Sequence, residues 1–385
     1  MSCTVPEARM DVLRERLGMR AFAERIPLTA TVEIIATCNF ACKHCYIAPC
    51  AEREDVMSLE QAQVLFDKLA AAGTLSVLLT GGEIFTHRQF REIYLAAKRH
   101  GFMIYLNTNA YLIGERWANF LAEWPPEYVS ISLYGLSDER YEAVTGIPNS
   151  FRRVTRAIDL LVERGVRTEL KCPAMSLTAD ELPAMKAFAE ARGLSFRYDP
   201  IMTPDDRGRS APIQLQLAPR RVVDLDEQMD PGLRDMRAFA DEIGVAPRRN
   251  NNVYQCGAGR TALSVNVKGG VSTCVSSRQT VGNLLEQPFD EVWGMLGGKV
   301  AKTFEDGHPC ATCKFRGICA GCPATVEQVT GLPDGYVQQY CKITHLRAQR
   351  MGFHETGVPR TVTEGIPSHV RVPLAQHARA LPVLA

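Results

Sequence analysis

Six short apolar runs recur between residues 30 and 200, and segments with helical periodicity separate them. The runs read ATVEIIAT, LSVLLT, FMIYLNT, YVSISLY, VRTELKC and LSFRYDP. Intervening segments such as SLEQAQVLFDKLAAAG and FRRVTRAIDLLVERG space their apolar residues as one face of a helix does. Repeated β-α units predict an α/β fold with a parallel sheet, and six units favour a partial (β/α)6 barrel over a closed one. Chemistry is expected in the loops that follow the strands.

The overall composition restricts the partners and the compartment. Lys and Arg total 44 against 43 Asp and Glu, so the net charge gives no reason to expect nucleic acid or a membrane surface as a partner. The first residues, MSCTVPEARMDVLRERLGMR, lack the apolar core of a secretion signal, and the longest apolar runs are only strand-length. We therefore expect a cytoplasmic protein, whose 13 cysteines stay reduced and act as metal ligands or reactive groups.

Most of the cysteines fall into two groups. The first group, in the loop after the first apolar run, is Cys38, Cys42 and Cys45. The second group is Cys256, Cys274, Cys310, Cys313, Cys319, Cys322 and Cys341. The remaining three, Cys3, Cys50 and Cys172, are scattered and are expected to be small core residues.

The first group suits an iron–sulfur cluster. A four-iron cube needs four thiolates, whereas this loop offers three and Cys50 is spaced awkwardly, so one iron would stay open. Zinc is the alternative, but zinc loops usually add a nearby His or a second Cys pair. His44 lies between the second and third thiols, where it would be strained as a ligand of the same metal.

Polar groups follow the next strands at the same edge of the predicted sheet. The second strand ends in TGGE, in which two glycines allow close approach of a ligand and Glu83 can receive a cationic amine. The third strand ends in Asn107, Thr108 and Asn109, and the fourth carries Ser130 and Ser132, which offer hydrogen bonds to hydroxyls.

Residues 30–200 closely resemble the radical S-adenosylmethionine (SAM) enzymes. CNFACKHC matches their C-x3-C-x-aromatic-C signature with His44 as the aromatic residue, and TGGE matches their methionine-binding motif. The resemblance implies a [4Fe–4S] cluster on Cys38, Cys42 and Cys45 whose open iron chelates SAM. The SAM contacts that it implies are Gly81, Gly82 and Glu83 for the amine, Tyr46 through its backbone for the adenine, Ser132 for the ribose, and Asn109. Many relatives have Ser-Leu-Asp-Gly after the fourth strand, whereas this chain has SLYG with Tyr134.

The C-terminal part predicts a second metal-binding unit. Residues 201–250 are rich in Pro, Asp and Arg and predict a linker with one helical stretch near DPGLRDMRAFADEIG. CGAGRTALSVNVKGGVSTC then predicts a β-hairpin with a Gly-Gly turn, and CATCKFRGICAGC a cysteine knot that a zinc ribbon could also explain. This block resembles the SPASM domain, which carries auxiliary iron–sulfur clusters, although Cys319 and Cys322 are separated by two residues rather than three.

The SPASM resemblance also implies how the seven cysteines divide. Cys310, Cys313, Cys319 and Cys341 would complete one auxiliary cluster, and Cys256, Cys274 and Cys322 would hold the inner one, nearer the barrel. Sulfatase-maturing relatives carry a further Cys where this chain has Ala262. The inner cluster is therefore expected to have an open iron, a non-cysteine ligand or a smaller core. Those relatives also have an Asp where this chain has Val275, which disfavours sulfatase-type maturation.

The expected domains are an N-terminal helical segment (1–29), the barrel (30–200), the linker (201–250), the SPASM domain (251–350) and a tail (351–385). The resemblance predicts a maturase, an oxidoreductase that forms a thioether or carbon–carbon crosslink, or inverts a centre, in a ribosomally made peptide. Oxidation of a small molecule and electron transfer without SAM chemistry are the alternatives. Asp199 and Lys171, at the ends of the sixth and fifth strands, are candidate acid–base or substrate-binding groups.

The expected partners are a precursor peptide and a reductant such as flavodoxin or ferredoxin. About thirty residues precede the first strand, too few for the winged-helix recognition domain of many peptide maturases. A separate leader-recognition protein, or direct docking of the leader peptide on this chain, is therefore expected.

Overall fold

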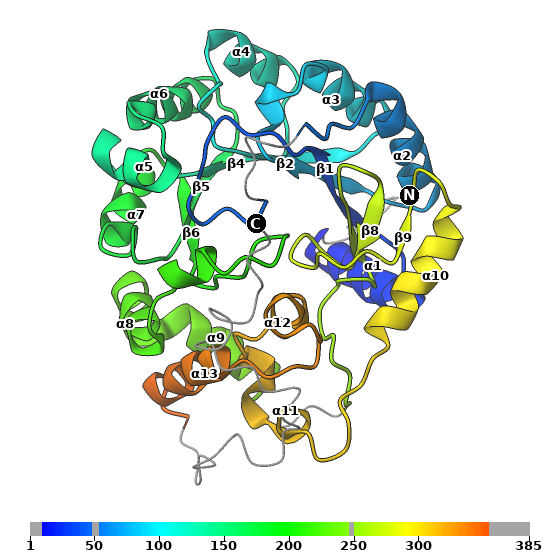
Figure 1. The fold of residues 1–385 in the computed structure, drawn as a ribbon, viewed down its shortest axis with the longest axis vertical. Coiled ribbons are helices and arrows are strands. Elements are labelled where there is room, and N and C mark those ends of the chain that lie inside the picture. Colours follow the sequence, from blue (N-terminus) through cyan, green and yellow to red (C-terminus); the bar gives the residue numbers. More distant parts are fainter. Residues whose placement is uncertain (1–9, 48–53, 246–249, 354–385) are drawn as a thin grey trace, which may run out of the picture.

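The computed structural model confirms the partial barrel (Figure 1). The structure describes residues 10–47, 54–245 and 250–353; Cys3, Cys50 and the predicted tail beyond residue 353 lie outside this part. The six barrel strands are β1 (Thr29–Ile35), β2 (Ser76–Gly81), β3 (Met103–Thr108), β4 (Tyr128–Ser132), β5 (Thr168–Pro173) and β6 (Ser195–Asp199). All five neighbouring pairs among them are parallel.

Helices cover the outer side of these strands (Figure 1). They are α2 (Leu59–Ala71), α3 (Phe90–Arg99), α4 (Glu115–Glu123), α5 (Asp138–Thr145), α6 (Ser150–Glu163) and α7 (Leu182–Glu190). The predicted helix after the first strand begins at a capping box, in which Ser58 and Gln61 satisfy each other's backbone N–H groups. This cap fixes the start of α2 behind the cysteine loop.

Alternation along the strands gives the sheet an apolar outer face and a polar inner one. The outward side chains are fully buried against the helices: Val77, Leu79, Ile104, Leu106, Val129 and Ile131. The intervening positions on β3, β4 and β5 carry Asn107, Ser130, Glu169 and Lys171, which are hydrogen-bonded to one another or to neighbouring inner side chains. Because side chains alternate in a strand, this pattern directs the polar groups into the barrel interior.

The predicted hairpin does not form a separate block but extends the barrel sheet. Its strands are β7 (Ala262–Val265) and β8 (Gly270–Ser272), followed by the short β9 (Gly282–Asn283). β7 pairs in parallel with β1, which gives one nine-stranded sheet in the order β6-β5-β4-β3-β2-β1-β7-β8-β9. The pairing satisfies the edge of β1, whose N–H and C=O groups would otherwise be exposed. Ala262, which stands where sulfatase-maturing relatives carry a further Cys, pairs with Thr29 at the start of this ladder.

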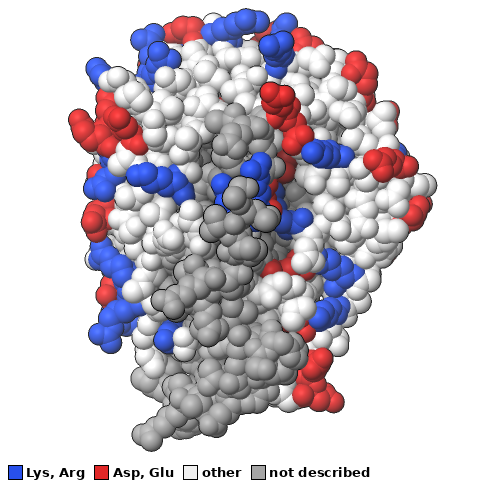
Figure 2. Space-filling view, viewed as in Figure 1, with Lys and Arg blue, Asp and Glu red and all other residues white. Residues whose placement is uncertain are grey.

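The remaining helices close the molecule around the hairpin and the cysteine knot. They are α1 (Met10–Glu24), α8 (Pro219–Met229), α9 (Arg234–Ile243), α10 (Phe289–Val300), α11 (Pro309–Thr312), α12 (Pro323–Thr330) and α13 (Gln338–Arg350). Figure 2 shows acidic and basic side chains interspersed around the rim of the visible face. In the part of the chain that the structure describes, none of the helices combines the length and apolarity needed to cross a membrane.

The prediction of a linker with one helical stretch over 201–250 was wrong in one respect. The helical stretch is present as α9, but α8 precedes it and packs against α13 and α7. The packing depends on a buried ion pair, in which Arg347 of α13 contacts Asp226 of α8 at 2.8 Å and Tyr198 Oη donates to the same carboxylate. Asp226 of α8 and Arg347 of α13 lie 121 residues apart in the sequence, so the polar composition of residues 201–250 did not predict this contact.

Replacement of Arg347 by Gln is expected to destabilise the protein by about 3 to 5 kcal/mol, because the Asp226 carboxylate stays buried without its cation. The matched control is Arg350→Gln on the same helix, since Arg350 pairs with Asp224 at 3.0 Å but both side chains are exposed. Arg350→Gln should lower the free energy of unfolding by at most about 1 kcal/mol. Urea unfolding would measure both, and equal losses would contradict the buried pair's role.

Candidate functional site

Cys38, Cys42 and Cys45 lie together in the loop that follows β1. Within the loop, Phe40 N donates to Cys38 Sγ at 3.4 Å, and Cys45 N donates to Cys42 O at 3.1 Å. Burial, followed by neighbouring Cys45 and Cys38, raises the pKa of the Cys42 thiol well above its usual value. Burial and the Glu83 carboxylate raise the pKa of Cys38 to about 12. Two desolvated thiols with a third in the same loop suit a cationic iron cluster, because thiolate is the ligand form and iron would neutralise its charge.

Gly81 and Gly82 bring the end of β2 against the backbone that leads into this loop. Gly82 N donates to Ile35 O at 2.7 Å, and Glu83 N donates to Thr37 O at 3.0 Å. A Cβ on Gly81 would lie 2.0 Å from Ile35 O, and one on Gly82 would lie 2.2 Å from Thr37 O. Gly81 also has a φ of +137°, which favours glycine. The close approach expected for a ligand is, in this structure, an approach to the cysteine loop itself.

Glu83 is fully buried and connects two strand ends. Its carboxylate accepts from Thr108 Oγ1 and Asn109 N, both at 2.7 Å, and from Phe85 N at 3.1 Å. Burial raises its pKa to about 6, although these hydrogen bonds oppose the shift. A cationic amine of the kind predicted from the sequence would have to share the carboxylate with these donors.

Asn109 continues the connection from β3 to the cysteine loop. Its Nδ2 donates to Asn39 Oδ1 at 2.9 Å and lies 3.7 Å from Cys38 Sγ. Its own Oδ1 accepts from Tyr111 N, so the side chain is held at both ends. Asn109 therefore lies beside the first thiol.

Tyr134, which departs from the usual family residue, lies beside the second thiol. Its buried ring contacts the His44 ring, with centroids 5.1 Å apart, and its hydroxyl interacts with Cys42 and Ser132. Burial lowers the pKa of His44 to about 4, so the imidazole is neutral at physiological pH. Ser132 is at the end of β4, where its backbone carbonyl accepts from Tyr141 Oη at 3.4 Å.

Tyr46 directly follows the third thiol and is held from two sides. Its carbonyl oxygen accepts from Asp206 N at 2.9 Å. Its ring lies under the Arg278 guanidinium, 4.4 Å from the ring centroid. A carbonyl has two lone pairs, so the Tyr46 oxygen can accept a second hydrogen bond.

Lys171 and Asp199 lie near the ends of β5 and β6 and differ in their contacts. Lys171 Nζ donates to Asn107 Oδ1 at 2.6 Å, and burial together with Arg197 lowers its pKa to about 7. Asp199 Oδ1 accepts from Ile201 N at 2.8 Å, which caps the turn after β6. Burial raises the pKa of this carboxyl.

The second cysteine group surrounds one cavity of about 810 Å³ beside the barrel. Its lining includes six of the predicted ligands, Cys256, Cys310, Cys313, Cys319, Cys322 and Cys341. The eleven cysteines in the described ranges are free thiols, and the isolated Cys172 is a buried core residue as predicted. Within the same ranges no three His, Cys, Asp or Glu side chains are placed to hold a single metal ion.

Electrostatic neighbours divide the seven auxiliary cysteines into two sets. Burial raises the pKa of Cys310 most, Cys319, Cys313 and Cys341 raise it further, and Arg316 opposes them. Burial and then Cys322 raise the pKa of Cys274 to about 11, with a smaller effect of Cys256. The structure thus brings together a set of four thiols and a set of three.

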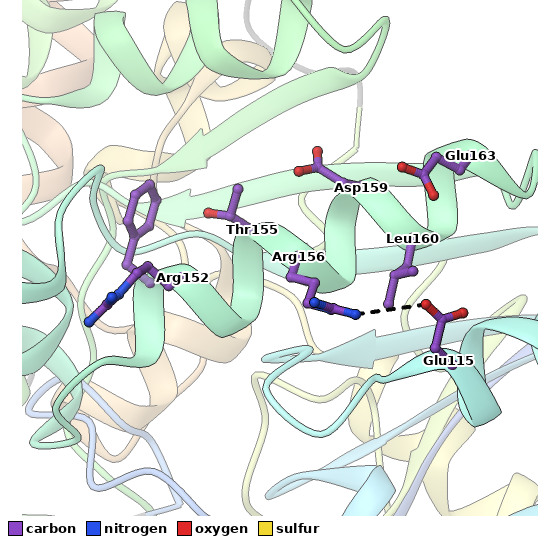
Figure 3. A pocket seen from close by; sticks show the side chains of 8 residues that line it. Glu115, Arg152, Thr155, Arg156, Asp159, Leu160 and Glu163 are labelled. Atoms are coloured by element: carbon purple, nitrogen blue, oxygen red, sulfur yellow. Dashed lines mark ion pairs between the residues drawn. The ribbon is translucent and has the colours of Figure 1, made fainter.

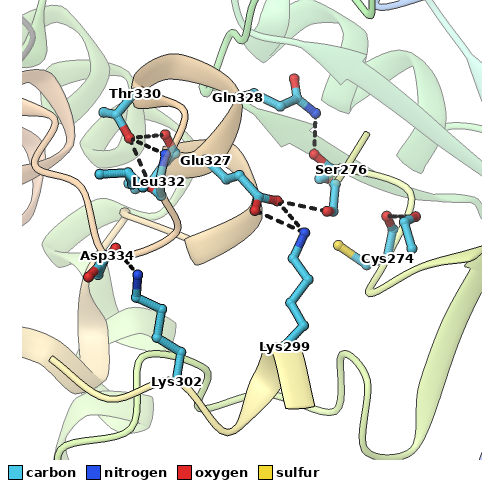
Figure 4. Close-up of polar contacts among 12 residues, drawn as sticks. Cys274, Ser276, Lys299, Lys302, Glu327, Gln328, Thr330, Leu332 and Asp334 are labelled. Carbon is cyan, nitrogen blue, oxygen red and sulfur yellow. Dashed lines mark hydrogen bonds and ion pairs between the residues drawn. The ribbon is translucent and has the colours of Figure 1, made fainter. Parts of the chain in front are cut away.

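A buried ion pair lies beside the set of three. Lys299 contacts Glu327 at 2.9 Å, and Ser277 Oγ donates to the same carboxylate at 2.9 Å. Figure 4 shows the Cys274 side chain pointing toward this pair. The polar contacts join α10 and α12 to the loop after β8, and so they fix the position of Cys274 relative to Cys322.

A second hollow, of about 540 Å³, lies on the outer surface between α4 and α6 (Figure 3). Charged side chains of both signs line it, including Glu115, Arg156 and Asp159. No residue that the sequence predicted for a site lines this hollow, so the candidate site is the strand-end region and the adjoining cysteine cavity.

Three residues at the site had no sequence signal that identified them. Arg278 lies in a loop without a motif, and its partner Glu33 is 245 residues away. Asp206 falls within the stretch that predicted a linker. Tyr134 was visible only as a departure from the family pattern, and its contact with Cys42 depends on how the β4 loop folds back.

Comparison with known proteins agrees with this geometry. Residues 32–189 match the radical SAM superfamily, and residues 256–323 match an iron–sulfur cluster-binding domain of the SPASM type. Among curated proteins, the chain is 25% identical over 307 residues to the antilisterial bacteriocin subtilosin biosynthesis protein AlbA of Bacillus subtilis, covering 77% of this chain and 67% of AlbA. It is 24% identical over 324 residues to an AdoMet-dependent heme synthase of Methanosarcina barkeri, covering 78% of this chain and 92% of that protein.

Among solved structures, the fold resembles Streptococcus suis SuiB bound to its precursor peptide SuiA. The TM-score is 0.65 at 17% sequence identity, and the match covers 89% of this chain and 84% of SuiB. At this identity the likeness establishes the fold.

Replacement of Gly82 by Ala is expected to destabilise the protein by about 3 kcal/mol or more and to lower its iron content, because the new Cβ meets Thr37 O at the start of the cysteine loop. The matched control is Gly294→Ala in α10, where a Cβ has no neighbour within 4 Å and helix propensity favours Ala. Unfolding curves and iron analysis would measure both variants. Wild-type stability and iron in Gly82→Ala would show that the loop contact is dispensable.

Proposed function

We propose that the chain is an enzyme that modifies a ribosomally made precursor peptide, because residues 32–189 match the radical SAM superfamily and residues 256–323 match the SPASM domain. The observation that carries the proposal is the cavity lined by six auxiliary cysteines, which adjoins a barrel whose first loop presents three more. An electron carrier without SAM chemistry would not need the TGGE loop that is fixed against this triplet.

We assign the triplet Cys38, Cys42 and Cys45 to a [4Fe–4S] cluster. When bound, this cluster and SAM supply reductive cleavage of SAM to methionine and a 5′-deoxyadenosyl radical, which abstracts hydrogen from the substrate. The SAM contacts are assigned to Gly81, Gly82, Glu83, Asn109, Ser132 and the backbone of Tyr46. Buried neighbours such as Tyr134 exclude water from the same region.

We assign the set of four thiols, Cys310, Cys313, Cys319 and Cys341, to a complete auxiliary cluster. The set of three, Cys256, Cys274 and Cys322, would hold the inner cluster with one position left for another ligand. A cysteine-bearing peptide is the ligand we propose for that position, because thiolate is the ligand that iron–sulfur clusters prefer. This favours a thioether product over a carbon–carbon crosslink or epimerisation.

A peptide substrate is supported by the relatives that act in peptide biosynthesis. AlbA is named for bacteriocin biosynthesis, and SuiB was solved with its precursor peptide. We propose that the leader peptide docks directly on this chain or through a separate recognition protein. A flavodoxin or ferredoxin would supply the electron.

Chemistry on a small molecule is the second candidate. The AdoMet-dependent heme synthase matches over 92% of its own length, at an identity close to that of AlbA, and it is named for heme synthesis rather than for a peptide product. The set of three thiols favours the peptide, since it offers a position for a substrate sulfur.

Lys171 is the proposed acid–base group of the barrel interior. Its ammonium is held by Asn107, and a pKa near 7 lets it exchange a proton at physiological pH. Asp199 has a structural partner in Ile201 N, so we propose that it caps the turn rather than reacting.

Replacement of Cys38, Cys42 and Cys45 together by Ala should abolish formation of 5′-deoxyadenosine and spare the auxiliary clusters, because the triplet follows the backbone at Ile35 and Thr37 that the TGGE loop contacts. The matched control is Cys172→Ala, which removes a buried thiol outside both groups. Electron paramagnetic resonance would then be recorded with a peptide encoded beside the gene. The peptide should perturb the inner cluster's signal, and its Cys-to-Ser version should not.

Deoxyadenosine formation by the triple variant would refute the triplet assignment. Equal signals with both peptides, or undiminished turnover of the Ser version, would refute the thiolate ligand and favour carbon–carbon chemistry. Turnover of a porphyrin in place of any peptide would favour the second candidate.

Lys171→Met is expected to lower peptide turnover by about 100-fold or more, because the general acid or base is lost. In the wild type the protonated fraction of Lys171 falls as pH rises through about 7, so the rate should change with an inflection there. The variant should lose that inflection and keep SAM cleavage. The control Asp199→Asn retains an oxygen for Ile201 N and should turn over normally. An unchanged inflection in Lys171→Met would assign it to another group.

A further inference from the structure

Arg278 joins the auxiliary domain to both ends of the cysteine loop. It lies in the loop after β8, and its Nη1 donates to Glu33 Oε1 of β1 at 2.9 Å. The same guanidinium lies over the Tyr46 ring, 4.4 Å from the centroid. Glu33 precedes the three thiols and Tyr46 directly follows them. One side chain therefore holds the two flanks of the loop.

The surroundings make this contact strong. The Glu33 side chain is 9% exposed and that of Arg278 is 20% exposed, so the ion pair is largely shielded from water. The Asp206 carboxylate also attracts the guanidinium, and Asp206 N holds the Tyr46 carbonyl at 2.9 Å. The attraction between a cation and an aromatic face is stronger when both groups are desolvated. Tyr46 is thus fixed at its ring and at its backbone.

The chemistry of the contact requires arginine. The planar guanidinium can pair with a carboxylate at its edge while its face stacks on a ring. A lysine ammonium in the same place could keep the pairing with Glu33, but it has no planar face to lay on Tyr46. The two parts of the contact can therefore be separated by substitution.

We propose that Arg278 is a positioning residue through which the auxiliary domain completes the SAM site. The inference rests on the proposed function, which places the Tyr46 backbone beside the adenine. Arg278 fixes the Tyr46 ring, the ring fixes the backbone that follows Cys45, and SAM binds to the loop in this position. Loss of Arg278 should therefore weaken SAM binding without removing a cluster ligand.

The experiment measures the dissociation constant of SAM for the reconstituted protein, from the change in the reduced cluster's paramagnetic resonance signal. Arg278→Gln should weaken SAM binding about tenfold, which corresponds to about 1.4 kcal/mol. Arg278→Lys should also weaken it, because the stacked face is lost although the charge remains. Iron content should stay at the wild-type value in both.

Arg25→Gln is the matched control. Arg25 also joins two distant segments, with its guanidinium 4.9 Å from the Trp293 ring centroid and hydrogen bonds to the carbonyls of Gly259 and Trp293. Within the described residues, its hydrogen bonds and its ring contact all go to residues outside the cysteine loop. Its loss should lower the free energy of unfolding and leave SAM affinity unchanged.

Two further variants separate positioning from folding, because Arg278→Gln leaves the Glu33 carboxylate buried without a partner. The double variant Glu33→Gln with Arg278→Gln removes that charge and should fold, yet it should still bind SAM weakly. Tyr46→Leu keeps the ion pair and should weaken SAM binding to a similar degree. The combined variant Tyr46→Leu with Arg278→Gln should bind SAM only slightly more weakly than either single variant, because both substitutions remove the same contact.

Wild-type SAM affinity in Arg278→Gln, or its full recovery in the double variant, would overturn the inference. Additive losses in Tyr46→Leu with Arg278→Gln would also overturn it. Failure of the wild-type protein to bind SAM would instead overturn the proposed function on which the inference rests.

Discussion

Strand β1 is paired on both sides, and the arrangement of the site depends on this. On one side it continues the parallel ladder of the barrel to β2, and on the other it pairs in parallel with β7 of the hairpin. The cysteine loop leaves the end of this shared strand, and the loop after β8 carries both Cys274 and Arg278. The barrel and the auxiliary domain are therefore parts of one sheet, and a shift of one moves the other.

The loop that carries the triplet is held by groups that are themselves buried. The backbone N–H groups of Gly82 and Glu83 donate to the carbonyls of Ile35 and Thr37. The Glu83 carboxylate accepts a hydrogen bond from Asn109 N at the end of β3. Arg278 pairs with Glu33, which precedes the loop. Each buried polar atom in this set costs free energy unless it is paired, so the partners are obligatory rather than additional. The thiols have raised pKa values in the same environment. A cationic cluster would relieve that cost, which is the physical reason for expecting one here.

Much of the fold could be predicted from local patterns. The alternation of strand and helix periods predicted six barrel strands, and all six are present. The Gly-Gly turn predicted the hairpin, where Gly269 has a φ of +86°. Helix α8 was missed, because its apolar residues lie among Arg, Asp and Pro and only its contact with α13 makes it part of the core. Asp206 and the contacts of Tyr134 were missed for a similar reason, since they depend on packing between loops.

The sequence by itself determined which chemical groups are present and at what spacing: three thiols after the first strand, seven in the C-terminal part, and two glycines where the second strand ends. This information can be read from the sequence because periodicity and motif spacing depend only on residues that are close together in the chain. The tertiary structure decided which groups meet. It placed β7 beside β1, divided the auxiliary thiols into four and three, paired Arg278 with Glu33 across 245 residues, and lowered the pKa of Lys171. Pairing and desolvation are properties of segments far apart in the chain, so no local pattern specifies them.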